Sequence, residues 1–335
     1  MGYFAGRMKQ MIELLEQESD DPQILDRVLE RSHLTRAYLT PDGPMPTPVQ
    51  RATFLRECCD AMADNTFAAR AGLTFRDSTT LTAYISKYSR NLQSAIENSA
   101  KYFATVDSTL RYSLRVSGNT ASFEVEWLDP TLAKFHRYNE YILFAALSRM
   151  RTLTDTPFLP VELRFVHQVK SVQRQMQRVG NFPVIFGAER MEMILPLSAL
   201  ELPIPTYDPS LKEHLIQYAE RLMKDLITDE PTLRARIEGT LANNLPGRVL
   251  SADEVAANLG MSRRTFARRL KGEGQSYREI VDDLRCDLAK TYLKGGFSIS
   301  QVAFFLDYAD QAAFSTAFKR WTGENPSRFK ASSLH

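Results

Sequence analysis

Hydrophobic residues recur every three or four positions through most of the first hundred residues. The segments "QILDRVLERSHL" and "TPVQRATFLRECCDAMA" both follow this spacing, and the proline-rich segment "LTPDGPMPTP" separates them. A period near 3.6 residues predicts amphipathic helices. The later segment "STTLTAYISKYSRNLQSAIENSAKYF" predicts one longer helix, with Ser78 or Thr79 as its N-cap.

The period then changes to two. In "LRYSLRVSGNTASFEVEWL" polar and apolar residues alternate on both sides of Gly118-Asn119, which predicts a β-hairpin. The next segment, "DPTLAKFHRYNEYILFAALSRMRTL", returns to helical spacing, with Asp129 as cap and Pro130 at the first helical position. A strand, a short helix and two more strands are predicted in "VELRFVHQ", "KSVQRQMQRVG" and "FPVIFGAERMEMILP".

These patterns predict an α+β domain over residues 1–205, a helical linker over residues 206–229 and an all-α domain over residues 230–335. The linker begins after the proline-rich segment "LELPIPTYDPS" and contains "LKEHLIQYAERLMKDL". The apolar stripe of that helix either packs on its own domain or forms a dimer or inter-domain contact. The segment "TDEPT" is the predicted hinge.

The C-terminal domain contains two similar helix-turn-helix patterns, over Ser251–Gly274 and Ser298–Gly323. Each begins with a serine cap and an amphipathic helix, breaks at a short turn and resumes in a second helix. Ser262 caps the second helix of the first pattern, and the turn before it contains Gly260. A long helix in "SYREIVDDLRCDLAKTYLKGG" joins the two patterns and fixes their spacing. Tandem helix-turn-helix units predict binding to the DNA major groove.

Basic residues line the second helix of the first pattern. Arg264 and Arg268 are four positions apart and share one face, so each is a candidate for a bidentate contact with a guanine edge. Arg263, Arg269 and Lys271 are better placed for phosphates. The alternative is an arginine-rich helix face that is merely solvated. DNA contact is favoured because the cluster lies on the helix that such a fold inserts into the groove.

The second pattern has a less basic reading face. Gln311 is a candidate for an adenine contact, and Ser315 and Thr316 are candidates for base edges or phosphates. Ala312 offers only contact with a thymine methyl group. The phosphate candidates are Lys319, Arg320 and Arg328. The sequence therefore predicts that the first unit contributes most of the base specificity.

These two units, and above all the closing segment "AAFSTAFKRWTGENPSRFK", resemble the AraC/XylS family of bacterial transcription regulators. Residues 20–200, including "FPVIFGAERMEMILP", resemble the family's arabinose-binding-type N-terminal domain. The resemblance implies a homodimeric activator that binds double-stranded promoter DNA, contacts RNA polymerase and responds to a small-molecule effector. Members of this subgroup respond to varied effectors, so the name does not imply arabinose.

One position departs from the family pattern. Asp307 occupies the second turn, where the family usually has glycine. Aspartate tolerates the left-handed backbone conformation better than most residues, so the turn is expected to form with some strain or a changed angle. Together with the alanine-rich reading face, this departure puts base-specific reading by the second unit in doubt.

The composition of the chain indicates the cellular compartment and an uneven distribution of charge. No run of about 18 apolar residues is present, so no membrane span is expected. Residues 236–335 contain 15 Lys and Arg against 11 Asp and Glu, so the small basic excess lies in the predicted DNA-binding domain. Cys58, Cys59 and Cys286 have no metal-ligand spacing, which predicts a reduced, cytoplasmic protein without metal or cofactor. The adjacent Cys58 and Cys59 have two interpretations: they form a redox sensor, or they are simply small residues on a helix.

The effector-binding residues are harder to identify from the sequence. Aromatic hydroxyl groups and basic side chains on the N-terminal helices and strands form the candidate set: Tyr84, Tyr88, Arg90, Tyr138, Tyr141, Arg164 and His167. Each also has an ordinary structural interpretation, as a packed tyrosine, a solvated arginine or an isolated imidazole.

No catalytic motif is present, and the five histidines are scattered, so an enzyme is not expected. The sequence therefore predicts a DNA-binding transcription regulator controlled by an effector. Two alternatives stay open: a regulator whose N-terminal domain only dimerises, and an enzyme domain fused to a DNA-binding module.

Overall fold

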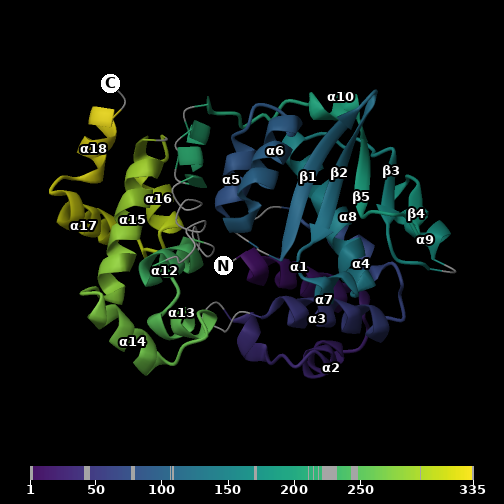
Figure 1. Cartoon of the computed structure of the whole chain (residues 1–335), viewed down its shortest axis with the longest axis horizontal. Helices are drawn as coiled ribbons and strands as arrows, with labels where there is room; N and C mark the ends of the chain where they lie inside the picture. Colours follow the sequence, from purple (N-terminus) through teal and green to yellow (C-terminus); the bar gives the residue numbers. More distant parts are fainter. Residues whose placement is uncertain are drawn as a thin grey trace. The chain divides into compact units, whose positions relative to one another are not determined.

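A computed structural model describes residues 3–40, 46–76, 80–105, 107, 109–169, 172–209, 211–213, 215–217, 219–220, 232–242, 248–294 and 296–333. The chain divides into two compact units. Unit 1 contains residues 1–3, 79–88 and 208–335, and unit 2 contains residues 4–78 and 89–207. Figure 1 shows the elements of both units along the chain.

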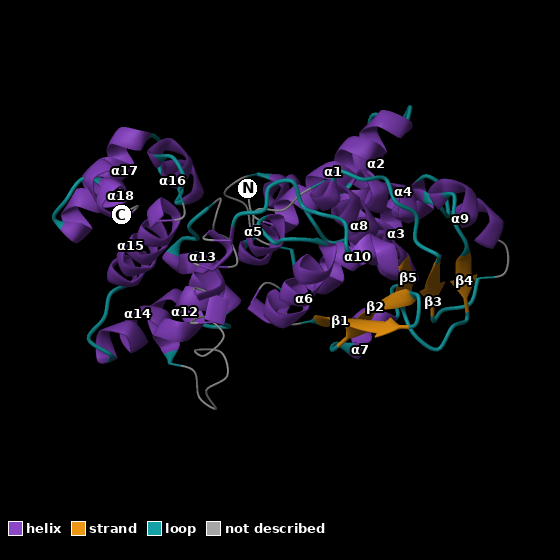
Figure 2. Ribbon diagram, turned by 90° about the horizontal axis from the view of Figure 1, so that it is seen from above, coloured by secondary structure: helices purple, strands orange, loops and turns teal. Residues whose placement is uncertain are grey.

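Unit 2 contains a five-stranded sheet in the order β1-β2-β5-β3-β4 (Figure 2). The strands are β1 (Leu110–Ser117), β2 (Thr120–Trp127), β3 (Glu162–Phe165), β4 (Val184–Phe186) and β5 (Glu192–Pro196). All neighbours are antiparallel except β3 and β4. The predicted hairpin is confirmed, and the turn residue Gly118 has φ +57°.

Helices supply the rest of unit 2. They are α1 (Tyr3–Glu18), α2 (Ile24–Arg31), α3 (Pro48–Ala61), α4 (Phe67–Thr74), α6 (Leu92–Tyr102), α7 (Pro130–Ala133), α8 (His136–Thr154), α9 (Gln173–Gly180) and α10 (Leu197–Leu200). Two short 3₁₀ helices cover Arg36–Leu39 and Phe103–Thr105. The α8 helix is buried along most of its length, and α4 packs closely on it. Figure 2 shows these helices beside the sheet.

Unit 1 is helical. It contains α5 (Leu81–Lys87), α12 (Leu233–Ala242), α13 (Ala252–Asn258), α14 (Arg263–Gly272), α15 (Tyr277–Lys294), α16 (Ile299–Phe305), α17 (Gln311–Thr322) and α18 (Pro326–Ser333). The α5 helix is distant in sequence from the others. Its Tyr84 ring lies 5.3 Å from the Phe305 ring, and its Tyr88 ring lies 5.9 Å from the Phe297 ring.

Two helices predicted as continuous are each broken in the structure. The segment predicted as one helix from residue 78 forms α5 and α6, because Asn91 adopts an extended conformation and caps α6 through the backbone N–H of Ser94. Thr80 caps α5, whereas the predicted caps Ser78 and Thr79 lie outside the described residues. Asp129 is a cap as predicted, but of the four-residue α7, and α8 begins separately at His136.

The observed division differs in detail from the predicted domain limits. The predicted boundary at residue 205 lies close to the division after Tyr207, but α5 groups with the C-terminal elements. Much of the predicted linker helix lies outside the described residues. In the described parts of the chain, no helix has the length and hydropathy needed to cross a membrane.

Candidate functional site

The first helix-turn-helix unit consists of α13 and α14, as its caps predict. The Ser251 hydroxyl accepts a hydrogen bond from the Glu254 N–H (3.3 Å), and the Glu254 carboxylate accepts one from the Ser251 N–H (2.6 Å). Gly260 has φ +68°, which glycine adopts without strain. The Ser262 hydroxyl then accepts from the Thr265 N–H at 3.2 Å and caps α14. The reciprocal capping at Ser251 fixes the start of α13, and the Ser262 cap fixes where the reading helix α14 begins.

The α14 helix presents one buried and one basic face. Phe266 and Leu270 are buried, and Phe266 packs edge-on against the Tyr277 ring at 6.0 Å. The five predicted basic contacts are all exposed: Arg263, Arg264, Arg268, Arg269 and Lys271. Arg263 forms an exposed ion pair with Asp253 at 3.1 Å. Among the described residues the other four have no ion-pair or hydrogen-bond partner, so their charges are available to a ligand.

The second unit consists of α16 and α17. Asp310 caps α17 by accepting from the Ala313 N–H at 2.7 Å, and Gly323 ends the helix with φ +80°. Gln311 and Ala312 are exposed at its first turn. The Ser315 and Thr316 hydroxyls donate back to helix carbonyls, at 2.8 and 3.0 Å. Their donors are therefore occupied, and only their oxygen lone pairs remain for a base edge.

The basic residues of the second unit lie toward its C-terminal end. Lys319, Arg320 and Arg328 are all exposed. The Arg320 guanidinium donates to the Asp282 carboxylate of α15 at 2.9 Å. Lys319 and Arg328 have no ion-pair partner among the described residues. This face therefore has less available positive charge than α14.

The unusual turn of the second unit has a specific set of contacts. Asp307 has φ +60°, so the predicted left-handed conformation is confirmed. Its carboxylate accepts a hydrogen bond from the Val249 N–H at 3.0 Å and lies 3.8 Å from the Arg285 guanidinium. Glycine could not supply this carboxylate. The aspartate thus attaches the second turn to the segment that precedes the first unit.

The α15 helix connects both units through a side chain at its start and another at its middle. At its start, the Tyr277 hydroxyl donates to the Leu250 carbonyl oxygen. Farther along, Arg285 donates to the Asp307 carbonyl oxygen at 3.2 Å and lies over the Tyr308 ring at 4.6 Å. Because the start of the first unit and the turn of the second are both attached to one continuous helix, α15 restrains the spacing of α14 and α17 within unit 1.

The seven effector candidates are divided between the two units. Tyr84 and Tyr88 belong to unit 1, whereas the other five belong to unit 2. Tyr138 and Tyr141 are buried and stack at 6.2 Å. Their positions, like the aromatic contacts of Tyr84 and Tyr88, agree with the packing interpretation of these residues.

The three basic effector candidates occupy different environments. Arg90 is exposed. Arg164 is half-exposed and pairs with Glu162 and with Glu192, the latter at 2.9 Å; these hydrogen bonds raise its pKa. His167 is buried, and its Nε2 lies 3.0 Å from the Glu140 carboxylate. Of these candidates, only His167 lies in a buried polar network.

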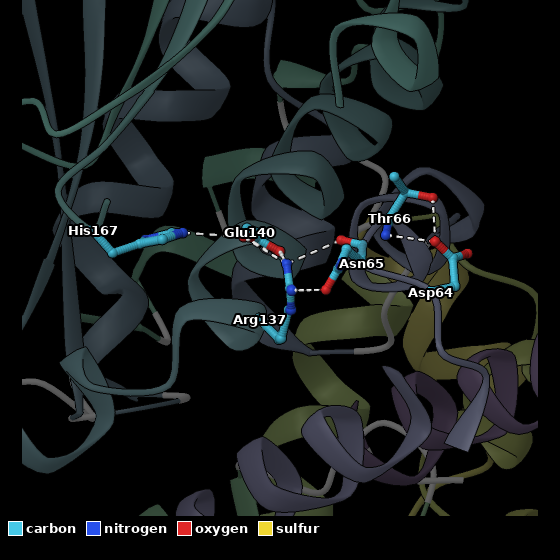
Figure 3. Close-up of polar contacts among 6 residues, drawn as sticks. All are labelled: Asp64, Asn65, Thr66, Arg137, Glu140 and His167. Carbon is cyan, nitrogen blue, oxygen red and sulfur yellow. Dashed lines mark hydrogen bonds and ion pairs between the residues drawn. The ribbon is translucent and has the colours of Figure 1, made fainter. Parts of the chain in front are cut away.

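That network, shown in Figure 3, extends from the sheet to α8 and the start of α4. The fully buried Glu140 carboxylate contacts His167 and accepts from the Arg137 guanidinium at 3.1 Å. Arg137 also donates to the Asn65 backbone oxygen at 3.0 Å and to its side-chain oxygen. Next to it, Asp64 accepts from the Thr66 N–H at 2.7 Å. The Glu140 charge is therefore compensated inside the fold.

A pocket of about 580 Å³ lies beside this network in unit 2. Most of its lining residues have polar side chains, and they come from α3, from the α7–α8 segment and from the segment after β3: Arg56, Asp60, Thr131, Lys134, Phe135, His136, Arg137, Glu140, Gln168 and Val169. The His136 ring stacks on the His167 ring at 4.4 Å, and partial burial together with His167 lowers the pKa of His136. None of the seven predicted effector residues lines this pocket. The only sequence feature that could have indicated this pocket is the cluster of charged residues in the segment Lys134–Glu140.

The cysteines lie in the core. Cys58, Cys59 and Cys286 are buried free thiols. Burial raises the pKa of Cys58 well above its usual value and that of Cys59 to about 12, so both thiols stay protonated. Within the described ranges, no group of three His, Cys, Asp or Glu side chains is placed to hold a metal ion.

Two sequence profiles match the chain. Residues 24–204 match the "Arabinose-binding domain of AraC transcription regulator, N-term", and residues 255–332 match a helix-turn-helix domain. The first match covers most of unit 2, and the second covers both reading helices and α15.

Curated relatives include an ornithine utilization regulator of Pseudomonas aeruginosa, 25% identical over 243 residues, covering 72% of this chain and 71% of the relative. The transcriptional regulator VirS of Mycobacterium tuberculosis is 32% identical over 130 residues, covering 38% of this chain and 37% of VirS. Among solved structures, the transcriptional regulator CdpR of Pseudomonas aeruginosa aligns over 92% of this chain and 97% of its own, at 22% identity and a TM-score of 0.40.

Proposed function

Because this chain belongs to the AraC family of transcription regulators, we propose that it reads DNA sequence mainly through the exposed face of α14. Membership gives it an N-terminal effector-binding domain and a C-terminal helix-turn-helix domain. The observation that carries the proposal is the contrast between the two reading helices. The α14 helix presents four basic side chains that have no partner in the described part of the chain, whereas the first turns of α17 present alanines and back-bonded hydroxyls.

Arg264 and Arg268 are the base-reading residues of this proposal. They lie one helical turn apart, opposite the buried Phe266 and Leu270. Each guanidinium can donate two parallel hydrogen bonds to O6 and N7 of guanine, an arrangement worth roughly 1–3 kcal/mol of discrimination per base. Ser262 acts differently, because its hydroxyl already caps α14 and its place at the helix N-terminus suits a phosphate.

The remaining basic residues supply affinity without base specificity. Arg263, Arg269 and Lys271 flank the reading face of α14, and Lys319, Arg320 and Arg328 do the same in the second unit. Contacts of this kind release counterions from DNA, so binding weakens as salt rises. Gln311 remains the best candidate for a base contact from α17, where Ser315 and Thr316 can only accept.

In vitro selection from random duplexes with the full-length protein tests the proposal. We expect selected sites with two adjacent conserved blocks on one face of the duplex, because α15 holds two reading helices at fixed spacing. The block read by α14 should be guanine-containing and more strongly conserved than the other. Recovery of duplexes with no shared sequence would contradict the proposal.

We propose further that the protein acts in the cytoplasm as a homodimer and activates transcription by contacting RNA polymerase, without catalytic activity. The support is the usual behaviour of the family and the buried, protonated state of Cys58 and Cys59, which disfavours a thiol enzyme. Sedimentation of the full-length protein tests the dimer. In vitro transcription from a selected site, with and without bound regulator, tests the activation.

A second candidate is a regulator whose N-terminal domain dimerises without a ligand. It differs from the first in one measurable respect. Thermal-shift screening of the full-length protein against pools of metabolites should give at least one stabilising pool if the effector-binding domain is used. Stabilisation by no pool, together with unchanged DNA binding, would favour the second candidate.

A further inference from the structure

The polar pocket of unit 2 combines groups from distant parts of the sequence. Arg56 and Asp60 come from α3, Lys134 and Arg137 from the α7–α8 segment, and Gln168 from the segment after β3. The volume of about 580 Å³ is in the range of pockets that hold small metabolites. Its floor includes the buried Glu140, whose partners Arg137 and His167 were described above. One side of the pocket is therefore formed by a hydrogen-bonded network of buried side chains.

The charges around the pocket are not all compensated by the protein. Glu140 is neutralised by Arg137, and Arg56 donates to Glu57 at 2.7 Å. Lys134 and Asp60 are left: both are exposed, and neither has an ion-pair partner among the described residues. The pocket thus offers one available cation and one available anion, which are not bonded to each other.

We propose that this pocket binds a small zwitterion, with its carboxylate at Lys134 and its ammonium group at Asp60. This inference rests on the proposed function, since it places the effector of the regulator in unit 2. Charge-assisted hydrogen bonds to the two charged groups orient the ligand. Phe135 and Val169 also line the pocket and can contact an aliphatic portion.

The neighbouring groups favour a zwitterion over a ligand with a single charge. A simple anion would be attracted to Lys134 but repelled by Asp60, and a simple cation would meet the reverse. Partial burial and the neighbouring His167 lower the pKa of the His136 imidazole, which favours its uncharged form. Its ring stacks on His167, so occupancy of the pocket contacts the Glu140–His167 network directly.

Isothermal titration calorimetry of the full-length protein with three probes of equal chain length tests this directly. L-norvaline carries both charges, pentanoate only the carboxylate and pentylamine only the ammonium group. We expect norvaline to bind at least about tenfold more tightly than either single-charge probe. Equal binding of norvaline and pentanoate, or no binding of norvaline at millimolar concentration, overturns the proposal.

Two variants test which residue binds each charged group of the ligand. Lys134→Gln should weaken norvaline roughly tenfold and should not weaken pentylamine, because the variant removes a charge that repels the amine. Asp60→Asn should weaken norvaline and should not weaken pentanoate, because it removes a charge that repels the carboxylate. Both side chains are exposed and have no ion-pair partner within the described ranges, so the unfolding temperature without ligand should stay the same. The matched control is Arg111→Gln, which removes an exposed charge of β1 and should affect no probe. Equal loss for all probes in either variant contradicts the assignment.

DNA binding separates failure of this inference from failure of the proposed function. Each variant is also tested on a selected duplex without any probe. Retained DNA binding with no preference for the zwitterion rejects the pocket assignment alone. Loss of sequence-specific DNA binding by the unmodified protein rejects the proposed function, whatever the probes show.

Discussion

At the scale of single residues, local conformation was more predictable than function. Helix caps such as Ser251, Ser262 and Ser298 were evident from the sequence, because a cap depends on neighbours three residues away. The pocket residues Asp60 and Lys134 were not, because the fold brings them together from separate helices. No local pattern encodes that proximity.

The buried thiols give a direct prediction. Cys58 and Cys59 should react with iodoacetamide far more slowly in the native protein at pH 8 than in the unfolded chain, since burial keeps them protonated and inaccessible. Mass spectrometry after timed alkylation measures this. Rapid native labelling of either cysteine would instead support a redox role.

Asp307 gives a second prediction at this scale. Asp307→Ala should lower the free energy of unfolding of unit 1 by about 1–2 kcal/mol, because it removes the acceptor of the Val249 N–H and leaves a less tolerant residue at positive φ. Asp307→Gly also removes the acceptor but relieves the backbone strain, so it should cost less. Chemical denaturation of both variants measures the difference, and a glycine variant less stable than the alanine variant would contradict this explanation.

At the scale of elements, the sequence predicted where regular structure occurs better than where it is interrupted. The hairpin, the strands after it and both helix-turn-helix units lie where the periodicity placed them. The breaks before α6 and α8 were missed, because apolar spacing continues across them. In the first case the Asn91 cap competes successfully with continuation of the helix.

The packing of α4 on α8 depends on a glycine. A Cβ atom at Gly72 would lie 2.8 Å from the Tyr141 backbone oxygen and 2.9 Å from the Ala145 backbone nitrogen, which cannot move separately. Gly72→Ala should therefore destabilise unit 2 by about 1–3 kcal/mol. The control is Gly272→Ala on α14, where the added methyl meets nothing within 4 Å and should be neutral or slightly stabilising. The measurement is the unfolding temperature of both variants. Equal unfolding temperatures for Gly72→Ala and Gly272→Ala would contradict this explanation.

At the scale of the whole molecule, the order of the chain does not coincide with its units. The α5 helix lies in sequence between two segments of unit 2 but belongs to unit 1, where its tyrosines pack on Phe297 and Phe305. Sequence reasoning cannot detect such an exchange, because an amphipathic helix carries no record of which apolar surface it covers. The division into a sensor part and a DNA-reading part nevertheless follows from composition and motif.

The central claim is that α14 determines base preference. The most direct test compares the base preferences of two full-length variants. One is a double variant that combines Arg264→Ala and Arg268→Ala, and the other is Gln311→Ala. Base preference is measured by competition between a selected duplex and duplexes that differ from it by one base pair. We expect the double variant to lose discrimination at the guanine block, at roughly 1–3 kcal/mol per base, and Gln311→Ala to retain it. If the double variant kept its base preference while Gln311→Ala abolished it, the assignment of specificity to α14 would be wrong.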